Sequence, residues 1–275
     1  MSPTAAPDLD LPELAYYDAE LRGPRFHPEV SGLAGRSWLA RFPLGFVVLD
    51  REAGEFFLRS RQTMFPGQMV AQVFGVDGGP LRDEIDRNIL HLNGSDHSRL
   101  RGLVNHAFTP KAADAWRPVM REFVADVFAP LAPRGHMEAV GELCTVYPAM
   151  TIARVVGAPV EDAQRLAVWS NWIQRQFAAD FLEHRSQIEQ ACAELYEYLH
   201  ALVAERRAQP QGDLISTLIA ARQEQAEPLR RRAGSARPVQ DRLDDAELVN
   251  LVLNVLVGGV DTTQSQLAHA LRVFA

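Results

Sequence analysis

The stretch from Leu248 to Phe274, LVNLVLNVLVGGVDTTQSQLAHALRVF, constrains the fold of this chain more than any other. Between Leu248 and Val257, only Asn250 and Asn254 interrupt an apolar run that covers every side of a helix. Such a run predicts a helix that is buried on all faces. We predict that its apolar part is too short to span a bilayer.

The middle of this helix breaks the local rules of helix formation. Gly258 and Gly259 each cost about 1 kcal/mol relative to alanine in a helix interior. They are followed by the poor helix formers Asp261, Thr262 and Thr263. Local violations of this kind concentrate at functional sites.

Two interpretations of the glycine pair are open. In the first, the helix ends at Gly258, and Asp261 caps a second helix with Gln264 completing an approximate capping box. In the second, one helix continues, and its glycines let a flat ligand approach the backbone. Thr262 then lies over the turn that begins at Gly258, and its hydroxyl can bond back to a carbonyl of that turn. We favour the second, which predicts a buried groove with an acid and an alcohol beside it.

Composition limits the classes of function. A chain of 275 residues with 47% apolar residues can bury a sizeable core. Its net charge is −7 and its basic residues are dispersed, which indicates neither a nucleic-acid footprint nor a basic membrane patch. Residues 1–14 lack the apolar core of a signal peptide, and Cys144 and Cys192 form no disulfide framework or metal spacing. These features predict a cytoplasmic protein.

The N-terminal part carries the convincing β signal of the chain. Residues 1–14 read as an irregular arm, and residues 37–49 read as a β-hairpin. Asp50 then caps a helix that ends at Arg59. The remaining elements show helical spacing, so we predict a mainly α fold with a small N-terminal β-sheet, in a single domain over residues 1–275.

Residues 61–92 are predicted to form a long irregular connection, because glycines and prolines interrupt their pattern. The apolar side chains of this segment, among them Phe65, Val73 and Phe74, favour a lid over an apolar ligand.

Residues 95–108, SDHSRLRGLVNHAF, are predicted to form a helix. His97 and Arg101 fall together at one edge of its apolar arc. A half-buried pair of this kind suits a carboxylate or phosphate. An exposed pair near a helix start is an equally open interpretation of this segment alone.

Together these segments resemble the bacterial, soluble cytochrome P-450 family of haem-thiolate monooxygenases. The sequence GGVDTT matches the family's [AG]-G-x-[DE]-T-[TS] signature on its long distal helix, and HSRLR matches its H-x-x-x-R helix. A β-hairpin, a Phe-rich helix, an irregular loop, FTP and a GAP turn occur in the family's order. The resemblance therefore spans nearly the whole chain.

The resemblance implies the roles of particular residues. His97 and Arg101 would bind the two propionates of haem b, and Gly258 and Gly259 would lie against the distal face of the porphyrin. The catalytic acid and alcohol that supply protons during the activation of O2 would be Asp261 and Thr262. Contacts to an apolar small-molecule substrate would come from Phe65, Val73, Phe74, Asn254 and Val257. Electrons would come from a reductase through a ferredoxin-type carrier.

One departure from the family is large. Its E-x-x-R helix and its Cys-containing haem loop follow the distal helix, whereas this sequence ends at Ala275. Cys144 and Cys192 lack the surroundings of the ligand loop and read as small buried helix residues. We therefore expect a chain truncated within the central helix over residues 244–275, with the axial cysteine beyond residue 275 and no metal ligand within these residues.

Two other functions are weighed against a monooxygenase. The chain could be a non-catalytic fragment or pseudo-enzyme without thiolate-ligated haem. It could also be an all-helical regulator that binds a ligand, although no helix-turn-helix or basic face supports that class.

Overall fold

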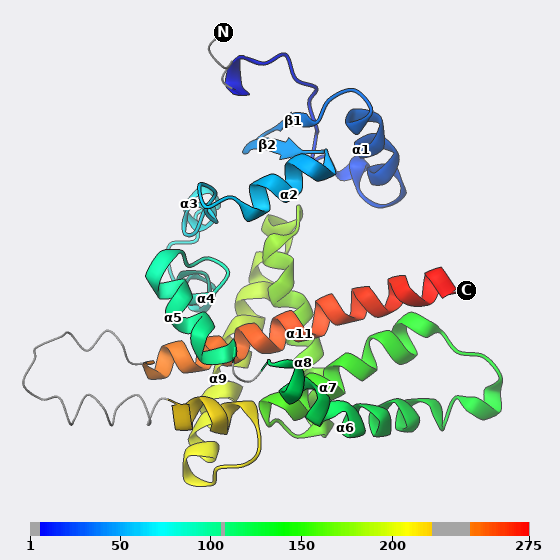
Figure 1. Cartoon of the computed structure of the whole chain (residues 1–275), viewed down its shortest axis with the longest axis vertical. Coiled ribbons are helices and arrows are strands. Elements are labelled where there is room, and N and C mark those ends of the chain that lie inside the picture. Colours follow the sequence, from blue (N-terminus) through cyan, green and yellow to red (C-terminus); the bar gives the residue numbers. More distant parts are fainter. Residues whose placement is uncertain (1–5, 106–107, 222–242, 275) are drawn as a thin grey trace, which may run out of the picture. The chain divides into compact units, whose positions relative to one another are not determined.

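The computed structural model of the chain describes residues 6–105, 108–221 and 243–274 (Figure 1). Their contacts divide the chain into two compact units, Met1–Met64 and Phe65–Ala275, and each unit is described by itself. Predictions that fall on residues 1–5, 106–107 and 275 lie outside the described residues. The assignment of one domain to residues 1–275 stays a prediction.

The first unit is built around the predicted hairpin. Its strands are β1 (Leu39–Phe42) and β2 (Gly45–Val48), which pair antiparallel from Leu39 opposite Val48 to Phe42 opposite Gly45. The helices are η1 (Ala6–Asp8), η2 (Ala19–Leu21), η3 (Gly23–Arg25), α1 (Phe26–Ala34) and α2 (Arg51–Arg59). The hairpin predicted within residues 37–49 is confirmed.

Helix α2 begins where the sequence predicts. The Asp50 side chain accepts a hydrogen bond of 2.8 Å from the Ala53 backbone N–H, which satisfies one of the unpaired donors of the first turn. The predicted end at Arg59 is also confirmed.

The predicted irregular arm is anchored to β1 at its last residues, where it forms an isolated bridge between Glu13 and Arg41. The Arg41 N–H donates to the Pro12 carbonyl and the Leu14 N–H donates to the Arg41 carbonyl, each at 2.8 Å. Leu14 is 3% exposed and packs in the unit's small core with Leu33 and Ala40. The free edge of β1 needs backbone partners, and this segment supplies them.

The regular elements described in the second unit are all helical. They are α3 (Met69–Val73), α4 (Pro80–Arg87), α5 (Gly94–Asn105), α6 (Pro110–Phe128), η4 (Ala132–Arg134), the π-helix η5 (Val140–Cys144), α7 (Val146–Val156), η6 (Val160–Asp162), α8 (Ala163–Gln174), η7 (Arg175–Phe177), η8 (Phe181–His184), α9 (Arg185–Ala208), a helix over 214–221, and α11 (Asp245–Phe274). The mainly α fold class with one small sheet is confirmed.

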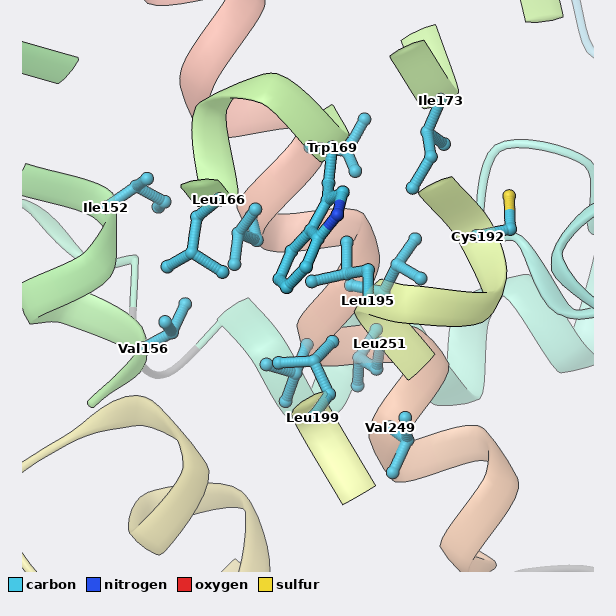
Figure 2. Packing of buried hydrophobic residues seen from close by; sticks show 14 of the residues in the cluster. Ile152, Val156, Leu166, Trp169, Ile173, Cys192, Leu195, Leu199, Val249 and Leu251 are labelled. Atoms are coloured by element: carbon cyan, nitrogen blue, oxygen red, sulfur yellow. The ribbon is translucent and has the colours of Figure 1, made fainter. Parts of the chain in front are cut away.

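The core of the second unit lies between α7, α8, α9 and α11. Figure 2 shows buried side chains from all four helices converging, among them Ile152, Trp169, Leu195 and Leu251. Cys192 packs in the same cluster and is 0% exposed. Both cysteines are buried, as the sequence predicts.

The segment predicted as an irregular lid over residues 61–92 contains two helices, α3 and α4. Ala71, Val76, Leu81 and Ile85 of this segment belong to the core, with exposures of 3% or less. The prediction of an irregular connection is therefore wrong for residues 69–73 and 80–87. Glycines stand outside the helices here, and Pro80 occupies the first turn of α4, where proline is tolerated.

Helix α11 is long and apolar enough, by length and composition, to cross a membrane, and it is the single helix of this kind among the described residues. The sequence predicted that the apolar part of this helix is too short to cross a membrane, and the whole helix from Asp245 to Phe274 does not meet that prediction. Half of the relevant window is buried inside the protein, as in the central helix of a globular core.

Candidate functional site

Helix α11 runs without interruption from Asp245 to Phe274, through both glycines. The interpretation in which the helix ends at Gly258 is therefore wrong. Residues 248–253 are each 2% exposed or less, so this part of the helix is buried on all sides as predicted. Beyond residue 257 one face of the helix becomes accessible, because Gly258 and Thr262 are both exposed.

The predicted back-bond of Thr262 is present. Its Oγ1 donates to the Gly258 carbonyl one turn earlier in α11. A threonine hydroxyl within a helix can reach this carbonyl because residues i and i+4 lie one above the other. The hydroxyl is thereby fixed beside the backbone of Gly258.

The two glycines have different surroundings. A Cβ atom added at Gly258 would meet nothing within 4 Å, whereas one added at Gly259 would lie 2.6 Å from Ile152 Cδ1. Gly258 therefore borders open space, and Gly259 permits close packing of α11 against α7. The open space at Gly258 supports the prediction that a flat ligand can approach there. At Gly259 the space that a side chain would enter is already filled by Ile152. Contact of either glycine with a porphyrin stays a prediction.

Asp261 is partly exposed and makes no hydrogen bond or ion pair within the described residues. Its carboxylate is thus accessible to solvent one position before Thr262. The two groups predicted as acid and alcohol adjoin on α11, and their catalytic role stays a prediction.

Asn254 and Val257, predicted to contact substrate, are held by the protein itself. The Asn254 Nδ2 donates to the backbone carbonyl of Asn250 at 2.7 Å and to its Oδ1 at 2.8 Å. The Asn250 Nδ2 in turn donates to the Tyr196 hydroxyl at 2.6 Å. Val257 is 6% exposed and packs in the core. Asn254 is thus fixed by hydrogen bonds, and Val257 is fixed by packing in the core. The contact of either residue with a substrate stays a prediction.

Helix α5 carries the predicted anion-binding pair. Leu100, Leu103 and Val104 are buried, as the apolar arc predicts. His97 is half-buried at the edge of this arc and Arg101 is exposed. Neither makes a hydrogen bond or ion pair with another described residue, so both keep their donors for a ligand.

A long-range ion pair joins α5 to the start of α11. The Arg99 guanidinium donates to both carboxylate oxygens of Glu247, which lies 148 residues later. Glu247 also completes a capping box: the Asp244 N–H donates to its Oε2 at 2.9 Å, and its own N–H donates to Asp244 Oδ1 at 2.7 Å. Burial would raise the pKa of Glu247, but the hydrogen bond from Arg99 lowers it, so the carboxylate is charged. The pair fixes the helix that carries His97 and Arg101 to the distal helix.

Two of the three predicted substrate residues in the lid segment, Phe65 and Phe74, pack against aromatic rings. Phe65 stacks on His91 at 5.0 Å between ring centroids, and Phe74 packs against Phe181 at 5.2 Å. Val73 is 51% exposed. The three side chains therefore differ in exposure, and their contact with a substrate stays a prediction.

Helix α4 carries a buried polar group that was not predicted from the sequence. Glu84 is 1% exposed and accepts a hydrogen bond from the Asn88 side chain. Burial raises the pKa of Glu84 to about 7, although the amides of Asn88 and Gln176 favour its charged form. Glu84 Oε2 and Gln176 Nε2 nevertheless lack good hydrogen-bond geometry to any described residue. The sequence PLRDEIDRN places Glu84 among charged residues, so only its proximity to Leu81 and Ile85 on one helix face indicates burial.

The open side of α11 fits a flat ligand with acidic groups. Gly258 offers backbone without a side chain, Thr262 and Asp261 stand beside it, and His97 and Arg101 keep unpaired donors on another helix. A porphyrin with two propionates has this combination of a planar surface and two carboxylates. These residues therefore fit haem chemically.

Comparisons with known proteins agree with this chemistry. The sequence profile described as "Cytochrome P450" matches residues 164–275. Luteothin monooxygenase of Streptomyces thioluteus is 32% identical over 273 residues, which are 97% of this chain and 61% of that protein. Cytochrome P450(BM-1) of Priestia megaterium is 28% identical over 66% of this chain and 41% of that protein.

Solved structures show the same fold. The crystal structure of CalO2 superposes with a TM-score of 0.75 at 23% identity, over 93% of this chain and 61% of that one. A structure of P450BioI in complex with an acyl carrier protein superposes with a TM-score of 0.75 at 19% identity, over 90% and 60% of the two chains. The chain thus spans about three fifths of the length of the first of these relatives.

Proposed function

Because the chain belongs to the cytochrome P450 family, we propose that its residues form the distal part of a haem-dependent monooxygenase, which inserts one atom of O2 into an apolar small molecule. The observation that carries this proposal is the uninterrupted helix α11. It presents bare backbone at Gly258 with the Thr262 hydroxyl fixed beside it.

Haem, when bound, supplies the iron at which O2 is activated. The chain's own residues bind and orient the group in this proposal. His97 and Arg101 bind its two propionates through charge-assisted hydrogen bonds. Gly258 lets the plane of the macrocycle approach the helix backbone closely.

Thr262 and Asp261 supply protons on the open side of α11 in this proposal. The Thr262 hydroxyl donates to the Gly258 carbonyl, which leaves its oxygen lone pairs to accept a hydrogen bond from a group in the groove. Asp261 is accessible to solvent and can exchange protons with it. Asp261 would collect protons from solvent, and the fixed Thr262 hydroxyl would accept a hydrogen bond from the donor that passes a proton on, which makes a short relay.

Three further assignments belong to the proposal. The electrons come from a ferredoxin-type carrier and its reductase, and the protein acts in the cytoplasm. A thiolate ligand of the haem iron would not come from Cys144 or Cys192, because both are buried in helical packing. That burial also favours the alternative function for residues 1–275 taken alone, a non-catalytic fragment without thiolate-ligated haem.

Replacing Thr262 by alanine in the protein that holds the complete haem site tests the relay. T262A removes the hydroxyl that is fixed at Gly258. We expect a larger share of the electrons to leave as hydrogen peroxide, and product formed per NADPH or NADH consumed to fall at least about tenfold, because a positioned proton-transfer group typically contributes about 10²–10⁴-fold to its step. Peroxide and product are measured in the same reaction.

The neighbouring threonine provides a matched control. Thr263 is exposed on another side of α11, so T263A should leave the coupling of electrons to product unchanged. T262S, which keeps a hydroxyl, should recover most of the coupling. If T262A and T263A couple equally well, Thr262 has no part in proton supply.

A further inference from the structure

A second cavity lies away from the open side of α11. Its volume is about 380 Å³, and it opens where α6, the end of α7 and the end of α9 meet the turn before the helix over 214–221. Cavities of this size are within the range that binds small molecules in proteins. None of the proposed haem or substrate residues lines it.

The floor of this cavity is a buried and fully paired charge cluster. Arg206 and Asp213 form an ion pair of 2.5 Å, and their side chains are 6% and 5% exposed. Arg206 also donates to Glu205 and to the Gly157 carbonyl. Asp213 accepts from the Ser216 N–H at 2.7 Å. The floor therefore has fixed geometry, and its charges are compensated within the protein.

The ion pair of Arg206 and Asp213 leaves room only for glycine at position 157. It ends α7 with a φ of +98°, a backbone conformation that side chains disfavour. A Cβ atom at this position would also overlap the Asp213 carboxylate. The turn is thus shaped by the ion pair, and it leaves the cavity open above it.

The remaining lining has two kinds of surface. One wall is apolar and includes Trp116 and Val119 of α6, which are both half-buried, together with Ala158. Arg154, at the end of α7, is exposed and makes no hydrogen bond or ion pair within the described residues. Arg154 is therefore the one lining charge that the described protein does not compensate.

We propose that this cavity binds a small aromatic carboxylate, with its ring against Trp116 and its carboxylate on the Arg154 guanidinium. Guanidinium binds carboxylate through two parallel hydrogen bonds, and indole provides a flat apolar surface for a ring. A cationic ligand would be repelled by Arg154. A purely apolar ligand would leave the Arg154 guanidinium without a polar partner. The site is independent of the proposed monooxygenase reaction.

Binding of 2-naphthoate to the protein as isolated tests the proposal, with 2-naphthamide as the neutral analogue of the same shape. Affinity is measured by calorimetry. The protein has four tryptophans, so labelling it with fluorotryptophan lets ¹⁹F NMR locate the binding site. We expect one equivalent of naphthoate to bind and to shift the Trp116 resonance, which W116F identifies. R154Q should weaken binding at least about tenfold, the usual effect of losing a charge-assisted hydrogen bond.

Arg117 is the matched control, because it is exposed on α6 beside Trp116 and pairs with Asp114 outside the cavity lining. R117Q should change the affinity by less than about twofold, since exposed charges act weakly on one another. The proposal fails if naphthoate does not bind, if naphthamide binds equally well, or if R117Q weakens binding as much as R154Q. It also fails if the shift appears only at Trp38, Trp169 or Trp172.

Discussion

At the scale of single residues, burial decides the chemistry of several polar groups. Glu84 is enclosed by core side chains, so its charged form loses hydration and its pKa rises to about 7. His91 is buried close by, and the same loss of hydration lowers its pKa. Asp261 and Arg101, by contrast, stay accessible to solvent. The groups that the proposed function uses are therefore the accessible ones, while Glu84 acts on stability.

The free energy of unfolding should depend on pH through the protonation of Glu84. Its pKa is about 7 when folded and near 4.5 when unfolded, so the folded state holds the proton to higher pH. The contribution of Glu84 to stability is present below about pH 4.5 and is lost as the pH rises to about 7, by roughly 3 kcal/mol. Urea unfolding between pH 4.5 and 8 should show this loss in the wild type and not in E84Q.

The comparison with E84Q removes the effects of other groups. His91 titrates with the opposite sign, and it is present in both proteins, so it cancels from the difference between them. E197Q alters an exposed glutamate of α9 and should run parallel to the wild type. Parallel curves for E84Q and the wild type would mean that the Glu84 carboxyl titrates normally.

At the scale of elements, α11 is shaped by a different neighbour along each part of its length. A capping box with Asp244 and the ion pair from Arg99 fix its start. Core side chains surround its first half, and Ile152 of α7 touches its middle at Gly259. The face of α11 that starts at Gly258 is the part of the helix that no described neighbour covers. A helix can thus carry two adjacent glycines for two separate reasons.

Single alanine substitutions should separate these reasons. G259A places a methyl group against Ile152 and should destabilise the protein by about 1–2 kcal/mol, the cost of overpacking less the gain in helix propensity. G258A faces open space and should stabilise it by up to about 1 kcal/mol. Both are measured by thermal and urea unfolding without added haem.

A second substitution tests the cause. I152V removes the Cδ1 atom that the new methyl group would meet, so G259A should cost less in that background than in the wild type. Equal stability of G258A and G259A would show that α7 does not restrict the backbone at residue 259.

At the scale of the whole molecule, the described residues offer one side of the proposed haem site and no accessible thiol. Its two cysteines, Cys144 and Cys192, are each 0% exposed. Loss of hydration raises the pKa of both thiols, which disfavours the thiolate that binds iron. Neither cysteine is therefore placed to supply a thiolate to the proposed site.

Haem added to residues 1–275 should accordingly lack a thiolate ligand. We expect purified chain titrated with haemin, then reduced and exposed to carbon monoxide, to show no thiolate-type absorption band. The variant C144A/C192A should give the same spectrum as the wild type. A thiolate-type band that disappears in this variant would show that one of the two cysteines reaches the iron.

The sequence by itself determined the features that depend on neighbours a few residues away. The Asp50 cap, the hairpin and the Thr262 bond to Gly258 follow from local spacing, since one turn or one strand pair fixes their geometry. The all-round apolar pattern of α11 likewise predicted its burial.

Only the tertiary structure decided the features whose partners lie far along the chain. Gly259 is explained by Ile152, and the start of α11 by Arg99, 148 residues before Glu247. The helices within residues 61–92 and the burial of Glu84 depend on packing against α9 and its neighbours. Such pairings arise from shape and from the loss of hydration across packed helices, which a pattern within one segment does not record.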